Sequence, residues 1–354
     1  GTHDLDIAIV GAGYTGLSAA LHLARAGYRV AVLEKHTVGW GASGRNGGQL
    51  CTGQRRDMFE LEKLIPRNDA KRLWLLAENA KKLVRDLIAE HNIVCDLKPG
   101  LIAAASKRSH YRYLDKYADH LRSKYDYNHL MLLDRSDIQK YIDTNIYYGG
   151  FIDRGAGHLH PLNFALGLAH AATKMGATIF QHSLVKKIDR QKNNRYSLRT
   201  GLGTVTASCL IIACNGYLEG LVPRLTNSIM PINNFILATE SLGKDRAEAL
   251  IREELGVCDT NFVVNYYRLS SDYRLLFGGG ETYTTRFPDD IASFVKPHML
   301  RVFPQLENTK IQYGWGGKLA ISRNRLPVFG RLEKDYYYAL GYSGQGLALA
   351  TLFG

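Results

Sequence analysis

The chain has 354 residues, enough to bury a large core and, by length alone, to form two domains. Its longest apolar runs, such as 209–214, fall far short of the roughly 20 residues that span a bilayer. The five cysteines are odd in number and form no CxxC pair, which argues against a disulfide framework and against a zinc site. We therefore expect no metal, no membrane span and a reducing, cytoplasmic location.

The formal charge of +12 is compatible with attraction to nucleic acid, to an anionic membrane or to an anionic substrate. The basic residues are dispersed, and the densest stretch, 107–124, interleaves acidic residues and tyrosines as an exposed helix face does. We interpret the charge as a basic solvated surface and expect no nucleic-acid partner. No charged and apolar leader precedes the first apolar run, so we expect no signal peptide.

The amino-terminal segment predicts a strand, a helix and a second strand. Residues 6–10 are a short apolar, β-branched run, typical of a strand buried on both faces. Leu and Ala then recur at helical spacing over 17–24 until Gly27, and residues 29–34 form the second strand. All three elements fit within about 30 residues, as a parallel βαβ unit requires.

The turn inside this unit carries the dinucleotide fingerprint Gly11-Ala12-Gly13-Tyr14-Thr15-Gly16. In such a turn the first glycine permits the bend, the second lets backbone N–H groups approach a pyrophosphate, and the third lets the helix pack close to the strand. A carboxylate closing the second strand accepts hydrogen bonds from an adenosine ribose and repels a 2′-phosphate, so NADP is disfavoured. The unit predicts a site for NAD or FAD at Gly11, Gly13, Tyr14, Thr15, Gly16, Glu34 and Lys35.

Two later glycine-rich loops favour FAD over NAD. Residues 41–49 follow the βαβ unit closely and can lay backbone N–H groups against a flat ring system, with Arg45 as countercharge for a reduced, anionic flavin. Residues 341–346 form a strand-to-helix loop. The helix that begins at Leu347 directs its positive dipole end toward this loop, where it stabilises negative charge developing at the flavin N1/C2 carbonyl.

The rest of the chain predicts mixed elements between these loops. Residues 69–91 form a long amphipathic helix, 209–213 a buried strand, and 231–313 aromatic, alternating strands with one helix at 245–255. We expect a Rossmann-like α/β FAD-binding domain with an interleaved α+β substrate domain built on a mixed or antiparallel sheet. The expected FAD-binding segments are 1–92, 150–220 and 325–354, and the expected substrate-domain segments are 93–149 and 221–324.

Five segments, in order and with matching spacing from about Asp4 onward, resemble those of a known family: 42–49, 157–161, 266–269, 277–280 and 341–346. On these residues the chain resembles the D-amino-acid-oxidase-like FAD-dependent amine oxidases. Within that family it looks most like the enzymes that oxidise gamma-glutamylputrescine. The substrate stays open, because relatives that act on sarcosine, glycine and other amines share most of these segments.

The resemblance implies a set of cofactor contacts. For the ADP half and pyrophosphate it adds Val185, Ala213 and Gly216 to the fingerprint residues. For the flavin ring and its pyrimidine edge it implies Ser43, Arg45, Asn46, Gly47, Gly48, Gln49, Gly341, Ser343, Gly344, Gln345 and Gly346. Some relatives attach flavin to a cysteine that residues 313–318 lack, so we expect non-covalent FAD. The family's final helix normally continues past the position of Gly354.

We expect Arg45, Tyr266, Arg268 and Trp315 at the catalytic site, where an arginine can grip a substrate carboxylate. His158 and His160 are expected to have structural roles. In the leading hypothesis a small-molecule amine transfers hydride from its α-carbon to flavin N5, the imine hydrolyses to an aldehyde, and O2 reoxidises the flavin to give H2O2.

Three hypotheses for the substrate follow. The first is a polyamine derivative such as gamma-glutamylputrescine. The second is a small amino acid such as sarcosine, glycine or a D-amino acid, acted on by an oxidase or dehydrogenase. The third is tRNA, because a tRNA-modifying flavoprotein carries a similar FAD module and this chain is basic; it predicts salt-sensitive tRNA binding. The sequence contains no signal for the oligomeric state.

Overall fold

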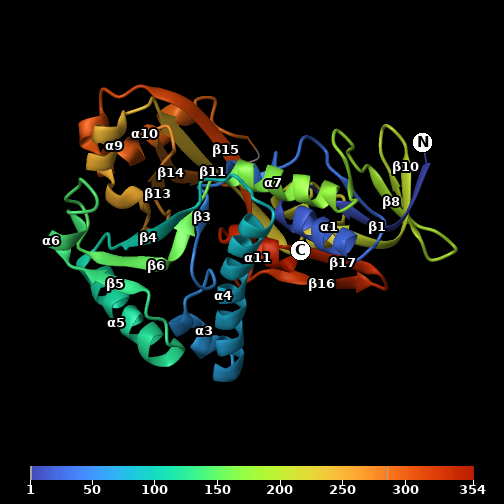
Figure 1. Ribbon diagram of the computed structural model, residues 1–354, viewed down its shortest axis with the longest axis horizontal. Coiled ribbons are helices and arrows are strands. Elements are labelled where there is room, and N and C mark those ends of the chain that lie inside the picture. Colours follow the sequence, from blue (N-terminus) through green and yellow to red (C-terminus); the bar gives the residue numbers. More distant parts are fainter. Residues whose placement is uncertain (1, 285) are drawn as a thin grey trace.

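Two β-sheets form the framework of the molecule, and Figure 1 shows them at opposite ends of its longest axis. The computed structural model describes residues 2–284 and 286–354. The first sheet contains β1 (Thr2–Val10), β2 (Val30–Leu33), β7 (Thr178–Phe180), β8 (Lys187–Arg190), β9 (Tyr196–Arg199), β10 (Thr204–Ile212), β16 (Val328–Glu333) and β17 (Tyr336–Leu340). The second contains β3 (Gln49–Leu50), β4 (Lys98–Ala104), β5 (Leu130–Leu133), β6 (Gly150–His158), β11 (Ile229–Thr239), β12 (Gly256–Asp259), β13 (Tyr266–Leu269), β14 (Leu275–Thr282) and β15 (Ile311–Ser322).

The first sheet is centred on β1. This strand runs parallel to β2 on one side and to β10 on the other, and β10 runs parallel to β17. Its apolar residues 7–10 are buried or nearly so, since helices cover one face of the sheet and the β8–β9 hairpin and the 218–225 segment contribute to the core on the other. The covering helices are α1 (Tyr14–Arg25), α7 (Pro161–Lys174), α11 (Gly346–Phe353) and part of α4 (Arg67–Glu90).

The second sheet is mixed but mainly antiparallel. β11 pairs antiparallel with β14 and β15, and β13 pairs antiparallel with β14 and β12, whereas β12 pairs parallel with β4. Its core includes residues of α9 (Lys244–Leu250) and α10 (Ile291–Val302). The predicted fold class, a Rossmann-like α/β layer combined with a mixed or antiparallel sheet, is confirmed.

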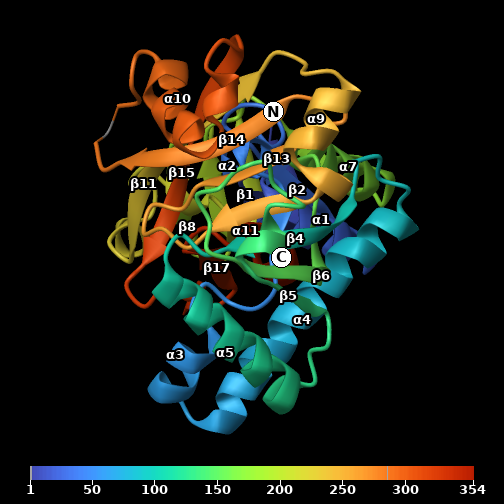
Figure 2. The ribbon, with the colours of Figure 1, turned by 90° about the vertical axis from the view of Figure 1, so that its left-hand side faces the viewer.

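Helix α4 runs between the two sheets and packs against α11 (Figure 1). Its buried residues recur at three- and four-residue steps: Ala70, Trp74, Ala77, Ala80, Lys81, Val84 and Leu87. The amino-terminal end packs instead with α3 (Met58–Leu64) and α5 (Arg108–Tyr125), which Figure 2 shows projecting from the body. None of the helices in the described part of the chain is long and apolar enough to cross a bilayer.

Shorter helical turns complete the chain: α2 (Ala42–Arg45), α6 (Arg135–Ile138), α8 (Pro223–Thr226), η1 (Asn215–Tyr217), η2 (Arg252–Glu254) and η3 (Pro304–Leu306). The domain boundaries expected from the sequence stay a prediction. Among the segments assigned to the FAD-binding domain, 150–220 contributes β6 to the second sheet and β7 to β10 to the first.

Candidate active site

The carboxyl ends of β1, β2 and β10 meet at one edge of the first sheet, around the Gly11 turn. Gly11 has a φ of +106°, and a Cβ there would lie 2.8 Å from the Ala213 carbonyl oxygen. A Cβ on Gly16 would lie 1.9 Å from the Gly11 carbonyl oxygen. Both positions therefore need glycine, the first for its backbone conformation and the second because α1 packs directly on the turn.

The 41–49 loop begins by covering the start of α1. The Ser43 hydroxyl accepts a hydrogen bond of 3.0 Å from the Tyr14 backbone N–H, one of the donors that a helix leaves unpaired in its first turn. A Cβ on Gly13 would lie 2.9 Å from the same hydroxyl. The structure thus places Ser43 at the helix end where the sequence predicts phosphate groups, and the absence of a Gly13 side chain leaves room for it.

Glu34 lies over the turn with its carboxylate fixed by two backbone donors. One oxygen accepts from Ala12 N–H and the other from His36 N–H, each at 2.8 Å. Both oxygens keep lone pairs for ribose hydroxyls. Lys35 instead forms an ion pair of 2.7 Å with Glu219. The chain leading to buried Val185 runs beside Glu34, since Ser183 N–H donates to the Glu34 carbonyl at 2.7 Å.

The end of β10 is tied to the last loop of the chain. Ala213 N–H donates to the Val10 carbonyl at 2.9 Å, and the Asn215 side-chain oxygen accepts from Gly341 N–H at 2.9 Å. Gly216 packs against β15, where a Cβ would lie 3.1 Å from the Lys318 carbonyl oxygen. Residues expected along the pyrophosphate therefore lie next to residues expected at the flavin.

Asn46 holds the second half of the 41–49 loop in one shape. Its amide N–H groups donate to the Ala42 and Ser43 carbonyls at 3.0 and 2.9 Å, and its oxygen accepts from Gly48 N–H at 2.7 Å. Gly48 has a φ of +77°, and a Cβ there would lie 1.9 Å from the Leu159 carbonyl oxygen. The loop is therefore preorganised.

The second sheet brings three of the four expected catalytic residues to this loop. Arg268 Nε donates to the Gly47 carbonyl at 2.8 Å, and Trp315 Nε1 donates to the Arg45 carbonyl at 3.0 Å. The Tyr266 ring packs on Gly47, where a Cβ would lie 2.8 Å from the ring carbons. β13 and β15 thus present one aromatic face to the loop.

The two arginines near the loop already have backbone partners. Arg45 donates to the Trp40 carbonyl at 2.5 Å and to the Gly316 carbonyl at 3.3 Å, and its guanidinium lies 4.5 Å from the centre of the Trp40 ring. Arg268 is 3% exposed and also donates to the Leu269 carbonyl at 3.0 Å. Burial lowers the pKa of Arg268 to about 10. The structure places Arg268 behind the loop, where it positions Gly47.

The 341–346 loop closes the site from the carboxyl-terminal side. Tyr342 and Thr15 share a hydroxyl hydrogen bond of 2.6 Å, and Ser343 Oγ accepts from Ser322 N–H at 3.2 Å. Gly344 has a φ of +96°, and a Cβ there would meet nothing within 4 Å. The loop is thus fixed on the amino-terminal side of Gly344 and open at Gly344 itself.

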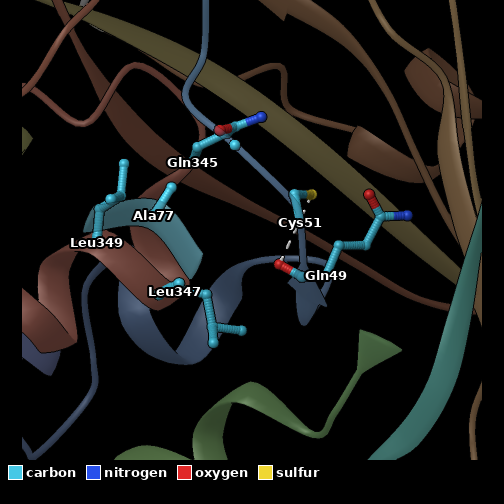
Figure 3. Close-up of a pocket in the computed structure, with 8 residues that line it drawn as sticks. Gln49, Cys51, Ala77, Gln345, Leu347 and Leu349 are labelled. Carbon is cyan, nitrogen blue, oxygen red and sulfur yellow. Dashed lines mark hydrogen bonds between the residues drawn. The ribbon is translucent and has the colours of Figure 1, made fainter. Parts of the chain in front are cut away.

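A narrow pocket lies beside this opening (Figure 3). Gln49 and Cys51 line one side of it, and α11 residues Leu347 and Leu349 line the other. Gln345 also lines it, and its Oε1 is buried without a hydrogen-bond partner among the described residues. A buried polar atom in this condition indicates a missing partner, such as a ligand.

The sequence profile described as "FAD dependent oxidoreductase" matches residues 6–354. The chain belongs to the FAD-dependent oxidoreductase family. It is 40% identical over 350 residues to gamma-glutamylputrescine oxidoreductase from Escherichia coli strain K12, covering 99% of this chain and 82% of that protein. The resemblance predicted from the sequence is confirmed.

Solved structures of other oxidases share the fold. Glycine oxidase from Geobacillus kaustophilus has a TM-score of 0.83 at 23% identity, covering 99% of this chain and 92% of that one. L-alpha-glycerophosphate oxidase from Mycoplasma pneumoniae, solved with FAD bound, has a TM-score of 0.76 at 15% identity, covering 99% and 95%. FAD is the cofactor of this oxidoreductase family member.

The observed residues fit FAD. The glycine turn and the fixed Glu34 carboxylate suit a nucleotide, and the 45–48 loop, held in one shape by Asn46, offers a preorganised backbone surface. The unpartnered Gln345 oxygen and the open side of Gly344 suit the edge of a ring that carries N–H groups. No group of three or more His, Cys, Asp or Glu side chains within 2–284 and 286–354 is arranged to hold a metal.

Sequence reasoning missed several residues of this site. Asn234 accepts a hydrogen bond from the Tyr266 hydroxyl and thereby orients its ring. The adjacent pair Asn233-Asn234 within an otherwise apolar strand was a signal for a polar role. Trp40, which stacks on His36 at 3.8 Å between ring centres and lies under Arg45, had no comparable signal.

His158 and His160 lie at the junction of β6 and α7. His160 Nδ1 accepts from Asn163 N–H at 3.2 Å and so caps α7. His158 is 1% exposed, and its Nε2 donates to the Glu254 carbonyl at 2.5 Å. Burial, followed by the charge of Arg268, lowers the pKa of His158 to about 4.

We expect His158 to make the protein acid-sensitive. In the unfolded chain His158 binds a proton below its ordinary pKa of about 6.5, whereas in the folded chain it does so only below about pH 4. The free energy of unfolding therefore falls as the pH is lowered from 6.5 to 4. The shift corresponds to about 3 kcal/mol at pH 4. In urea unfolding followed at several pH values, His158→Gln, which keeps an N–H donor but does not titrate, should lose less stability over this window. Parallel curves for the two proteins would contradict the assignment.

Proposed function

We propose that this flavoprotein oxidises an amine, gamma-glutamylputrescine or a related polyamine derivative, to an imine that hydrolyses to an aldehyde. The observation that carries the proposal is the 40% identity to gamma-glutamylputrescine oxidoreductase over 99% of the chain. That similarity extends over both sheets, so it includes the flavin loop and the aromatic face of β13 and β15. Non-covalent FAD and O2 as electron acceptor are parts of the same proposal.

Bound FAD would supply the two-electron acceptor for the hydride of the amine α-carbon, with O2 as the proposed final oxidant and H2O2 as its product. The protein itself positions the flavin loop and the substrate. Asn46 and Arg268 fix the loop on which the ring would lie, and the Tyr266 and Trp315 side chains pack against that loop and limit the access of water. The amino-terminal end of α11 would favour negative charge on a flavin ring bound next to it.

The residues of the proposed face are poorly suited to act as a base. Burial raises the pKa of Tyr266, and its hydroxyl donates to Asn234. Hydride leaves the α-carbon only of a neutral amine, so the site must favour loss of the ammonium proton. The nearby guanidinium groups of Arg45 and Arg268 lower the pKa of a bound ammonium through charge repulsion. We therefore propose that deprotonation needs no dedicated base.

Anaerobic reduction of the bound flavin tests this function. Gamma-glutamylputrescine is expected to bleach the visible absorbance of the purified holoenzyme within one turnover, and readmitted O2 to restore it with release of H2O2. Acid precipitation should release the flavin into the supernatant if attachment is non-covalent. The proposal fails if neither gamma-glutamylputrescine nor another N-acylated putrescine reduces the flavin.

Oxidation of a small amino acid is the second candidate. It is favoured by the 25% identity over 373 residues to glycine oxidase from Geobacillus kaustophilus. Sarcosine, glycine and D-alanine in the same anaerobic assay separate the two candidates, because reduction by one of these and not by N-acylated putrescines supports the amino-acid enzyme.

A further inference from the structure

Two chain turns meet at the side of the site formed by Cys51. Arg55 and Arg56 follow Cys51, which lines the pocket together with Gln345. Asn324 and Arg325 lie in the turn between β15 and β16. Arg56 Nε donates to the Asn324 carbonyl at 2.7 Å, so Arg55 and Arg325 are each one residue away from a direct bond between the two turns.

Among the described residues, neither the Arg55 nor the Arg325 guanidinium has an acidic group within ion-pair distance, although Glu60 attracts Arg55 from farther away. Arg56 forms an ion pair of 3.5 Å with Glu60. No hydrogen bond or ion pair joins the side chain of Arg55 or Arg325 to any residue in the described part of the chain. Both side chains are half-buried. Burial, followed by repulsion from Arg325, lowers the pKa of Arg55. Two partly desolvated positive charges on touching turns repel each other, at a cost in free energy unless an anion binds between them.

The other arginines of the site already donate hydrogen bonds to backbone carbonyls. The acceptors are the Trp40 carbonyl for Arg45 and the Gly47 carbonyl for Arg268. The surroundings of Arg325 are aromatic: its guanidinium lies 5.9 Å from the centre of the Phe262 ring, and its charge also acts on Tyr283. Phe262 and Tyr283 are 79% and 61% exposed. The arginine pair thus lies between Cys51, which lines the pocket, and the exposed rings of Phe262 and Tyr283.

We propose that Arg55 and Arg325 bind the substrate carboxylate at the end of the molecule remote from the reacting amine. This inference rests on the proposed function and adds the basis of its specificity. A forked guanidinium matches a carboxylate through paired N–H donors. Free putrescine carries a positive charge at both ends, so the same pair repels it. The site thereby selects an acylated diamine that carries a carboxylate over the bare diamine.

Steady-state kinetics with two matched substrates test the pair. Gamma-glutamylputrescine carries the carboxylate, and N-pentanoylputrescine has the same acyl length and the same reacting amine but lacks both this carboxylate and the ammonium group beside it. In Arg55→Gln and Arg325→Gln, kcat/KM for gamma-glutamylputrescine should fall about tenfold to a hundredfold through KM, as loss of a charged hydrogen bond predicts. The kcat/KM for N-pentanoylputrescine should not change in either variant. Arg331→Gln, at an exposed position on β16, is the control for loss of one positive charge.

Equal losses on both substrates would show that the arginines only support the fold, and no loss on gamma-glutamylputrescine would overturn the inference. Binding of gamma-glutamylbutylamide, which lacks the terminal amine, separates this inference from the proposed function. Calorimetric titration of the holoenzymes should show binding by wild type and Arg331→Gln and loss of binding in both pair variants. That result would support the carboxylate site even if wild type oxidised none of the amines. If the amines are oxidised but the pair variants still bind the amide, the carboxylate site is refuted and the proposed function stands.

Discussion

Gly16→Ala is expected to yield a protein that no longer retains FAD. The new methyl group would lie 1.9 Å from the Gly11 carbonyl oxygen, and neither the turn nor α1 has a flexible side chain there that could move aside. Overpacking in a core costs about 1–3 kcal/mol, and a clash with backbone lies at the upper end of that range or above. A loss of about 3 kcal/mol in cofactor binding corresponds to about a hundredfold in Kd.

The ratio of flavin to protein after purification and the Kd for added FAD measure this effect. Gly201→Ala is a suitable control, because a Cβ at Gly201 would meet only the end of the Lys186 side chain, at 3.9 Å. A Gly16→Ala protein that retains wild-type flavin content would show that α1 can shift at little cost.

Arg268→Met is expected to weaken FAD binding about tenfold to a hundredfold. The methionine keeps much of the side-chain volume but leaves the Gly47 carbonyl without its charged donor, a loss of about 1.5–3 kcal/mol. The flavin loop then loses its attachment to β13. Because the bond is to the loop, the effect should appear in the Kd for FAD and in kcat, and not selectively in KM for a substrate with a carboxylate.

Arg274→Met provides the matched control, since Arg274 also donates to a backbone carbonyl, that of Thr239 at 3.0 Å, but away from the flavin loop. Thermal unfolding of each variant separates a general loss of stability from a local one. If Arg268→Met keeps its FAD affinity and only its KM for gamma-glutamylputrescine rises, Arg268 itself holds the substrate carboxylate.

The sequence predicted the parts of the site that local pattern determines. Glycines at positions 11, 13 and 16 between two apolar runs define the nucleotide turn, and the helix expected at 69–91 is observed at Arg67–Glu90. The helix expected at 245–255 was too long. It ends at Leu250, because Ile251 is extended with a φ of −139°, and the φ values of +57° and +51° at Glu253 and Glu254 prevent the helix from resuming.

The contacts between the sheets depend on strand register, which a single sequence does not reveal. Tyr266 lies opposite Gly278, and this pairing leaves room for its ring next to Gly47. Asn234 reaches the Tyr266 hydroxyl because β11 and β13 both flank β14. In the same way Arg55 and Arg325 are 270 positions apart in the chain, and only the fold shows that their turns touch.

The order of the strands in the first sheet has a consequence for biosynthesis. β1 leaves the ribosome first, but its neighbour β10 and then β17 emerge much later, with most of the second sheet made in between. The Tyr342 hydroxyl that bonds Thr15 lies 327 positions after it in the chain. A nascent chain therefore exposes the edge of β1 that pairs with β10 until β10 has been made, and the cofactor finds its full set of contacts only after the 341–346 loop has emerged. Complete flavin contact thus depends on segments made long after the nucleotide turn.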